Sequence, residues 1–307
     1  MQRNRLKRFI GLCLAITFLI SNSAIGLTPL RPKTKDFAVP TNLTPSLAAA
    51  PTDRAVNYLD HCHVQQNQIT TTAPCLYGDL NSKVIVVLFG DSHALAWAPA
   101  LNALALKRHW KIYAQTMSSC NPADMPMWNI KTNEEMINCP IWREGAIKRI
   151  IKADPFLILM AGTRGFRTLN TDGNIASAEE MHQIWDAAIK RTITRFDKAL
   201  LTSILISDTP ITGDDPIGCL KAHLNSSIRC TFPVNKAIDD GWLETERQVS
   251  SDSGTPLIEP QLWVCPTDPC PVIIGNNLLY LDSGHMTATF SKTLANKLGV
   301  AIDKALK

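Results

Sequence analysis

The stretch VIVVLFGDSHALAWAPAL, residues 84–101, decides the fold class. Its first part, 84–90, is an unbroken apolar run rich in β-branched residues, which is typical of a strand buried on both faces. The run stops at Gly-Asp-Ser-His, and residues 94–109 then repeat apolar side chains at helical spacing. We expect Pro99 to lie in the first turn of this helix, where proline is tolerated. A buried strand that leads directly into a helix predicts a parallel α/β sheet.

The same alternation continues along the chain. Further strands are predicted at 110–116, 155–162, 198–207 and 255–260, and further helices at 134–153, 177–196, 234–252 and 287–306. Ser177 opens one helix with a Ser-x-x-Glu capping box, and Pro140 is expected to break or start another. The pattern predicts a three-layer α/β/α sandwich with a mainly parallel sheet of about five strands.

Two segments without this periodicity precede the domain, which we place at 56–307. Residues 1–26 put basic side chains before an apolar run, as an export signal peptide does, and an uncleaved membrane anchor is the alternative. Residues 27–55 are rich in Pro, Thr and Ala and are expected to form an extended linker. On either reading the domain is extracellular or at the cell surface.

The net charge argues against a nucleic-acid partner. The whole chain has a formal charge of +4, but residues 1–50 account for +6, so the remainder carries −2. A domain that binds nucleic acid usually has a strongly basic surface, and this one has no excess of basic residues to form it.

Cysteine usage agrees with export. Beyond Cys13 there are eight cysteines, and an even number in an exported chain indicates disulfides. They form four sequence-local couples, each around a predicted loop: Cys62 with Cys75, Cys120 with Cys139, Cys219 with Cys230, and Cys265 with Cys270. The competing idea is a metal site at His61-Cys62-His63, but the chain lacks a second ligand pair of the usual form. We therefore expect neither a metal nor a cofactor.

The Gly90-Asp91-Ser92 turn lies where a parallel sheet binds its ligands, at the carboxyl end of a strand. Ser92 is then close to a helix N-terminus, whose free N–H groups favour a developing oxyanion. The alternative is that Asp91 or Ser92 only caps the helix.

A second polar cluster follows another apolar run, in LLYLDSGHMTATF at 278–290. A serine nucleophile needs a base, and a histidine base works best when a carboxylate fixes its tautomer. Asp282 and His285 are spaced so that the carboxylate can meet one ring nitrogen. The alternative is an exposed His285 followed by Thr287 as a helix cap. Taken together, the two clusters predict a hydrolytic triad of Ser92, His285 and Asp282.

These residues also resemble a known family. Gly-Asp-Ser near the start and Asp-x-x-His near the end are similar to the first and last blocks of the SGNH (GDSL-type) hydrolases. The resemblance is closest to the SGNH domains associated with membrane acyltransferase-3 proteins, which O-acylate surface polysaccharides. It covers about residues 55–305 and also includes CLYGD (75–79), SSCNP (118–122), CPIWR (139–143) and YLDSGHMT (280–287).

The resemblance implies a role for each matching residue. Ser92 corresponds to the nucleophile, His285 to the base and Asp282 to the acid that orients the base. Asp91 corresponds to a structural residue of the turn, and the Ser92 amide to one oxyanion donor. Two departures concern the other donors. The usual second-block glycine has no obvious counterpart, and the region around Ser119 and Cys120 occupies its place. In MAGTRGFR (160–167) Thr163 or Arg164 is the candidate substitute for a missing asparagine.

Other candidate residues are assigned to structure rather than chemistry. His93 is expected to pack behind the site, Asp208 to belong to a turn and His182 to lie on the surface. The tryptophans are expected in the core, with Trp128, which lies in a loop, as the candidate exception: Trp97, Trp110, Trp142 and Trp185.

Two functional classes follow. The first is an enzyme that passes an acyl group, with acetyl as the first candidate, through Ser92 to or from a hydroxyl of an envelope glycan or another O-acylated substrate. Such an enzyme would work as a separate esterase or beside a membrane acyltransferase-3 protein. The second is an exported binding or scaffold module that keeps the fold without turnover, and the missing asparagine donor is the feature in its favour.

Overall fold

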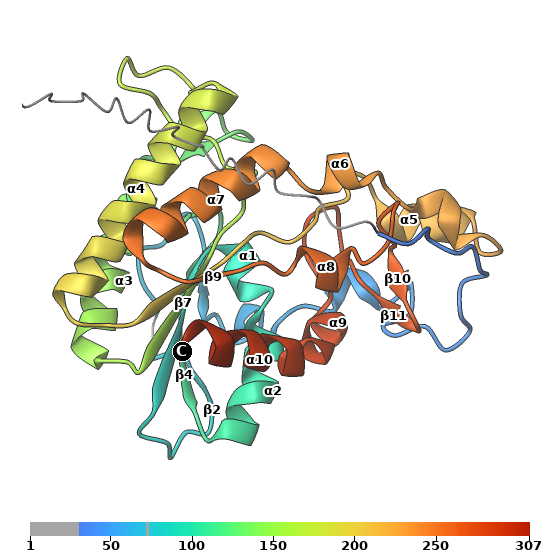
Figure 1. The fold of residues 1–307 in the computed structure, drawn as a ribbon, viewed down its shortest axis with the longest axis horizontal. Helices are drawn as coiled ribbons and strands as arrows, with labels where there is room; N and C mark the ends of the chain where they lie inside the picture. Colours follow the sequence, from blue (N-terminus) through green and yellow to red (C-terminus); the bar gives the residue numbers. More distant parts are fainter. Residues whose placement is uncertain (1–30, 72–73) are drawn as a thin grey trace, which may run out of the picture. The chain divides into compact units, whose positions relative to one another are not determined.

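Within residues 31–71 and 74–307, which the computed structural model describes, a seven-stranded sheet forms the centre of the domain (Figure 1). Six of its seven strands run parallel. Five of these follow one another in the order β4 (Lys111–Met117), β3 (Ile85–Gly90), β7 (Leu157–Ala161), β8 (Ser203–Ile206) and β9 (Leu257–Ile258). The predicted mainly parallel sheet is confirmed.

Two short strands share the free edge of β4. β1 (His63–Val64) pairs in parallel with the end of β4, through Thr116 and Met117. β2 (Leu76–Gly78) pairs antiparallel with its beginning. The segment around β1 therefore lies next to the carboxyl end of the sheet.

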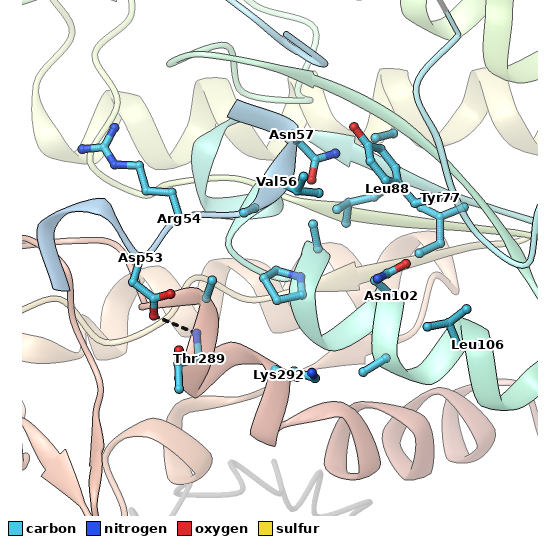
Figure 2. A pocket seen from close by; sticks show the side chains of 17 residues that line it. Asp53, Arg54, Val56, Asn57, Tyr77, Leu88, Asn102, Leu106, Thr289 and Lys292 are labelled. Atoms are coloured by element: carbon cyan, nitrogen blue, oxygen red, sulfur yellow. Dashed lines mark hydrogen bonds between the residues drawn. The ribbon is translucent and has the colours of Figure 1, made fainter. Parts of the chain in front are cut away.

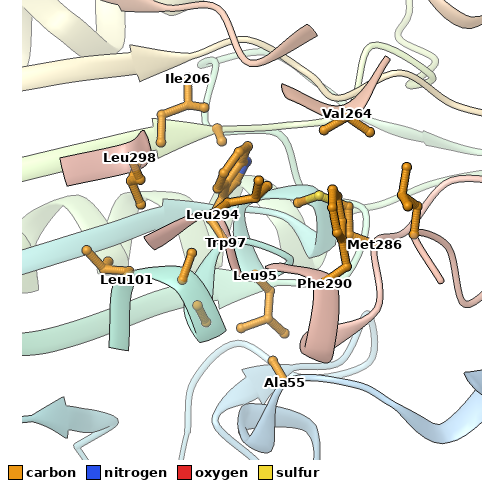
Figure 3. Close-up of a cluster of buried hydrophobic side chains, with 14 of the residues drawn as sticks. Ala55, Leu95, Trp97, Leu101, Ile206, Val264, Met286, Phe290, Leu294 and Leu298 are labelled. Atoms are coloured by element: carbon orange, nitrogen blue, oxygen red, sulfur yellow. The ribbon is translucent and has the colours of Figure 1, made fainter. Parts of the chain in front are cut away.

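Helices cover both faces of the sheet, as the sandwich requires (Figure 1). Val86 and Leu88 of β3 belong to one buried core, and Val87 and Phe89 belong to the other, because neighbouring strand residues point to opposite faces. Figure 3 shows the first core, in which Trp97 lies among side chains of α2, α9 and α10. The helices of the first face are α2 (Ala98–Arg108), α9 (Ala288–Thr293) and α10 (Ala295–Ala305), and those of the second are α3 (Asn138–Ala153), α4 (Ala178–Lys198) and α7 (Asp240–Ser253).

Several predicted helices are shorter or divided. The helix expected at 94–109 is split into α1 (Ser92–Leu95) and α2, with Pro99 in the first turn of α2. α3 starts only at Asn138, with Pro140 in its first turn. The helix expected at 234–252 is divided into α6 (Val234–Ala237) and α7 because the Asp239 side chain caps the second piece.

The expected linker at 27–55 is not an extended spacer over the part that the structure describes. Residues 31–55 belong to the folded unit Arg31–Lys307, and Leu43 and Ala50 of this segment are buried. The Thr44 amide donates to the Asn276 carbonyl at 2.7 Å, and the Ala288 amide donates to the Asp53 carbonyl at 2.8 Å. The few apolar side chains of this Pro-rich segment are thus enough to pack it on the domain. Residues 1–30, with the predicted signal or anchor, lie outside the described residues.

All four predicted disulfides are present, and each closes a loop. The Cys120–Cys139 bridge encloses a small hairpin of β5 (Trp128–Asn129) and β6 (Glu134–Glu135). Among the described residues no helix has the length and apolar character needed to cross a membrane. The smaller elements are α5 (Pro216–Ala222), α8 (Gln261–Val264), β10 (Ile273–Ile274), β11 (Asn277–Leu278) and the 3₁₀ turns at Ala50–Thr52, Val56–Tyr58 and Ser227–Cys230.

Candidate active site

The turn between β3 and α1 places Ser92 at the carboxyl edge of the sheet. Gly90 has a φ of 147°, and a Cβ atom at this position would lie 1.8 Å from the Ala161 carbonyl oxygen of β7. Asp91 caps α1 by accepting the His93 amide at 2.8 Å, and its other oxygen accepts the Thr163 amide at 2.8 Å. The capping role of Asp91 and its structural role in the turn are therefore both real. Burial raises the pKa of this carboxyl.

Ser92, His285 and Asp282 form one hydrogen-bonded chain. The Ser92 Oγ lies 2.9 Å from His285 Nε2, and His285 Nδ1 lies 3.0 Å from each carboxylate oxygen of Asp282. Because Nδ1 donates to the carboxylate, Nε2 is left to accept the serine proton. Thr287 caps α9 through the Phe290 amide, so the predicted cap and the predicted base coexist.

Asp282 is held as an anion. Burial opposes its charge, but the hydrogen bond and charge of His285, together with the amides of Gly284 and His285, outweigh burial and lower the pKa of Asp282 to about 2. The carboxylate therefore stays ionised over the whole range in which a histidine works as a base.

The three side chains line a pocket of about 360 Å³, which we call the catalytic pocket. Five further polar residues of its wall were not singled out from the sequence. Four lie in irregular segments with no motif, and Ser118 lies in the SSCNP stretch beside Ser119. The five residues are Arg54, Tyr58, Gln65, Ser118 and Lys131. Arg54 belongs to the segment that was assigned to the linker, so the packing of that segment onto the domain also completes the pocket.

Ser92 and Ser119 are the candidate backbone donors to an oxyanion, and both residues line the catalytic pocket. Ser92 is the first residue of α1, so its amide has no partner within the helix. Ser119 lines the pocket with a φ of 58°, the left-handed conformation that favours glycine, which agrees with its place at the second-block glycine.

Thr163 and Arg164 do not line the catalytic pocket. Their amides donate to buried carboxylates, Thr163 to Asp91 at 2.8 Å and Arg164 to Asp208 at 2.9 Å. The Arg164 guanidinium donates to the carbonyl of Thr209. Both residues therefore support the turn from behind, and an oxyanion role for them has no geometric support.

A second histidine–carboxylate pair lies directly behind the triad. His93 Nδ1 is 2.6 Å from Asp208, which is buried rather than part of an exposed turn. Burial opposes the His93 charge, but the carboxylate of Asp208 and its hydrogen bond raise the pKa of His93 to about 9. The ring centroids of His93 and His285 are 4.8 Å apart, so His93 packs behind the base as expected.

Another buried carboxyl lies next to this pair. Glu246 of α7 accepts a hydrogen bond from Ser207, and the Gln261 side chain donates to the Ser207 hydroxyl at 2.6 Å. Burial raises the pKa of Glu246 to about 8, so this group is protonated at neutral pH. His182, which was expected on the surface, is half-buried against the same helix and hydrogen-bonds Thr245.

A separate, mainly apolar cavity of about 330 Å³ lies on the other side of Arg54 and Ala55 (Figure 2). Figure 2 shows Leu88, Asn102 and Lys292 around it. None of the triad side chains lines this cavity. The chemistry is therefore assigned to the catalytic pocket.

The sequence His61-Cys62-His63 does not form a metal site, since Cys62 is bonded to Cys75. Within the described part of the chain, no group of three or more His, Cys, Asp or Glu side chains is arranged to hold a metal ion. Of the tryptophans, Trp97, Trp110, Trp142 and Trp185 are buried as expected, whereas Trp128 is only half-buried.

Comparison with known proteins identifies the fold. The family model described as "SGNH domain (fused to AT3 domains)" matches residues 61–299. The periplasmic domain of a lipopolysaccharide acetyltransferase from Salmonella ser. Paratyphi A is similar in structure, with a TM-score of 0.58 and 18% identity over 73% of this chain and 85% of that one. No curated protein matches the chain.

Two further solved structures are similar at lower scores. A GDSL-like lipase from Bacteroides thetaiotaomicron has a TM-score of 0.41 and 11% identity over 73% of this chain and 89% of that one. An acetyl xylan esterase, AlAXEase, has a TM-score of 0.41 and 10% identity over 71% of this chain and 100% of that one.

Proposed function

The chain belongs to the family of SGNH domains that occur fused to AT3 domains, and we propose that it is an exported serine-dependent acyl-transfer enzyme. The observation that carries the proposal is the hydrogen-bonded chain from Asp282 through His285 to Ser92 in the wall of the catalytic pocket. A serine, a histidine and a carboxylate in this order activate a nucleophile, and binding alone does not require that activation.

The reaction proposed for this geometry is a two-step acyl transfer. His285 Nε2 takes the Ser92 proton while Oγ attacks the ester carbonyl carbon. The carbonyl oxygen becomes an oxyanion, and we propose the backbone amides of Ser92 and Ser119 as its hydrogen-bond donors. Collapse breaks the ester bond, and the leaving hydroxyl oxygen receives the proton from His285. The acyl group on Ser92 then passes to water or to a second hydroxyl by the same steps in reverse.

Asp282 stabilises the imidazolium that forms in each step and remains ionised itself. Its pKa of about 2 supports this role, since no proton competes for the carboxylate near neutral pH. We propose no cofactor for the reaction.

For the substrate we propose an O-acylated polysaccharide or glycoconjugate of the cell envelope, with a membrane acyltransferase-3 protein as partner. The family description, which names AT3 domains, supports the partner. The Salmonella neighbour is described as a lipopolysaccharide acetyltransferase, which supports the substrate class. The four disulfides support an oxidising compartment outside the cytoplasm. Residues 1–26 would then serve as signal peptide or anchor, as their sequence indicates.

Replacement of the nucleophile tests the proposal. Ser92→Ala is expected to abolish hydrolysis of p-nitrophenyl acetate and to leave the melting temperature nearly unchanged, because the hydroxyl acts only in covalent chemistry. Ser177→Ala is the matched control, since Ser177 caps α4 far along the chain from the triad. It should cost about 1 kcal/mol of stability and leave turnover intact. Full activity of Ser92→Ala would end the enzyme hypothesis.

A further inference from the structure

A second cavity, of about 590 Å³, opens beside the catalytic pocket, and we call it the side groove. Both are lined by Gln65, Ser118, Ser119 and Lys131, so they share a wall at the carboxyl end of β4. The catalytic pocket and the side groove are therefore neighbours, and one extended ligand could contact the lining of both.

The walls of the side groove are fixed before any ligand arrives. One wall is the β5–β6 hairpin, which the Cys120–Cys139 bridge encloses. The Trp128 amide donates to the Arg167 carbonyl at 2.9 Å, and this bond ties the hairpin to the segment that follows β7. The Asn129 side chain donates to Gln66 at 2.8 Å, which ties the hairpin to the loop after β1. A preformed groove keeps the ordering cost of binding low.

The chemistry of the lining suits a sugar. Trp128 offers an aromatic surface, and its buried Nε1–H has no hydrogen-bond partner among the described residues. Because this nitrogen has almost no accessible surface, the contact that Trp128 offers a ligand in the groove is its ring. Side-chain amides of Gln65 and Asn67 add donors and acceptors. An aromatic surface surrounded by amides is the combination that binds hydroxyl-rich rings with apolar faces.

The charge of the lining is one-sided. Lys131 and Arg167 line the side groove, and no Asp or Glu does. The Arg167 guanidinium donates to the Phe166 carbonyl at 2.8 Å, and within the described residues neither cation forms an ion pair with a carboxylate. The remainder of the chain after residue 50 carries a formal −2, so this pair of cations is a local feature rather than part of a basic surface.

From this juxtaposition we propose that the side groove binds an anionic saccharide unit, with a carboxylate or a phosphate, of the same glycan whose hydroxyl exchanges its acyl group at Ser92. The identification of the ligand as part of the acylated glycan rests on the proposed function. The lining of the groove and its charge do not depend on whether the protein turns over a substrate. Trp128 stacks on the sugar ring, and Lys131 and Arg167 bind its anionic group.

Calorimetric titration of the full chain with three hexamers tests this proposal: hexagalacturonate for a carboxylate, a glycerol phosphate hexamer for a phosphate, and maltohexaose as the neutral probe. One or both anionic hexamers should bind about tenfold more tightly than maltohexaose, which corresponds to about 1.4 kcal/mol. The preference should shrink at high salt because ions screen the contact. Whichever anionic probe binds more tightly identifies the group. Equal binding of all three, or no binding of any, would overturn the proposal.

Variants separate the two parts of the groove. Lys131→Gln and Arg167→Gln should each weaken the binding of the anionic hexamers about tenfold and leave the binding of maltohexaose unchanged. Trp128→Ala should weaken the binding of all three hexamers by the same factor, because stacking on the ring does not depend on the charge of the sugar. Lys152→Gln, at an exposed position of α3, removes the same charge outside the groove and is the matched control. A loss of anionic binding in the control as large as in Arg167→Gln would also overturn the proposal.

Ser92→Ala distinguishes a failure here from a failure of the proposed function. If both proposals hold, this variant loses ester hydrolysis and still binds the anionic hexamers. Binding without ester hydrolysis in the unchanged chain would contradict the function alone. Hydrolysis that depends on Ser92, without a preference for anionic hexamers, would contradict the side groove alone.

Discussion

Two carboxylates pair with histidines near Ser92, and the two pairs differ in how far they are exposed to solvent. Asp282 has a side chain that is 41% exposed and holds His285, whose other nitrogen meets the serine. Asp208 is 1% exposed and holds His93, which only packs against His285. We therefore propose that the partly exposed pair exchanges protons with a substrate and that the buried pair keeps it in position.

Removing the charge of each carboxylate tests this assignment. Asp282→Asn should lower the turnover of p-nitrophenyl acetate by about 10⁴-fold, because an amide in this place favours the wrong tautomer of His285. Compared with Asp282→Asn, Asp208→Asn should lower turnover far less and the melting temperature more. The reason is that a buried acceptor of the His93 and Arg164 hydrogen bonds is lost. Turnover and melting temperature of both variants are the measurements. A loss below about a hundredfold in Asp282→Asn would mean that another group orients His285.

The triad could be predicted from the sequence because each half is local. Asp282 and His285 are three residues apart, and Ser92 follows a recognisable strand end. His93 and Asp208 are 115 residues apart in the sequence, so no local pattern predicts that they pair. The proposed oxyanion donors, the amides of Ser92 and Ser119, belong to the backbone, so only the family resemblance and not a side-chain pattern points to them.

At the scale of elements, the backbones of β3 and β7 approach each other so closely at Gly90 that no side chain fits there. A Cβ atom there would overlap the Ala161 carbonyl oxygen, and that oxygen belongs to the backbone and cannot rotate away. The same residue starts the turn that carries Asp91 and Ser92. The approach of two strands and the position of the nucleophile thus depend on one missing side chain.

Gly90→Ala is therefore expected to destabilise the domain by several kcal/mol or to prevent folding. Gly173→Ala is the matched control: its φ is also positive, at 79°, but a Cβ atom there meets nothing within 4 Å. The control should cost only the backbone strain of about 1–2 kcal/mol. Urea unfolding of both variants measures the difference. Similar losses would show that β3 and β7 do not approach as closely as the structure describes.

Periodicity predicted which elements exist better than where they end. The strand at 84–90 was found because an apolar run long enough to be buried on both faces is unambiguous. The breaks near Trp97 and Asp239 were missed because the apolar repeat continues across them, and only a cap or a proline marks the interruption. The packing of residues 31–55 was missed because its few contacts, such as that of Leu43, are with distant parts of the chain.

Over the whole molecule, the buried ionisable groups determine how stability changes with pH. Glu246 has a folded pKa of about 8 against an ordinary 4.5, and His93 has about 9 against 6.5. Both keep a proton in the folded state that the unfolded chain releases, so their stabilisation is complete at low pH and is lost as pH rises. His63 acts in the opposite direction, since burial lowers its pKa to about 4, but only between about pH 4 and 6.5.

Between pH 6.5 and 9 only the falling contributions of Glu246 and His93 remain among these three groups, and we expect the free energy of unfolding to decrease across this window. Each group changes the free energy of unfolding by about 1.4 kcal/mol per pH unit at most. Glu246→Gln removes one titration, so its stability should fall less steeply between pH 6.5 and 8. Glu244→Gln, an exposed change on the same helix, should keep the slope of the unchanged chain. Urea unfolding at each pH measures these slopes. A stability that rises from pH 6.5 to 9, or equal slopes in the two variants, would mean that Glu246 is already ionised in the folded protein.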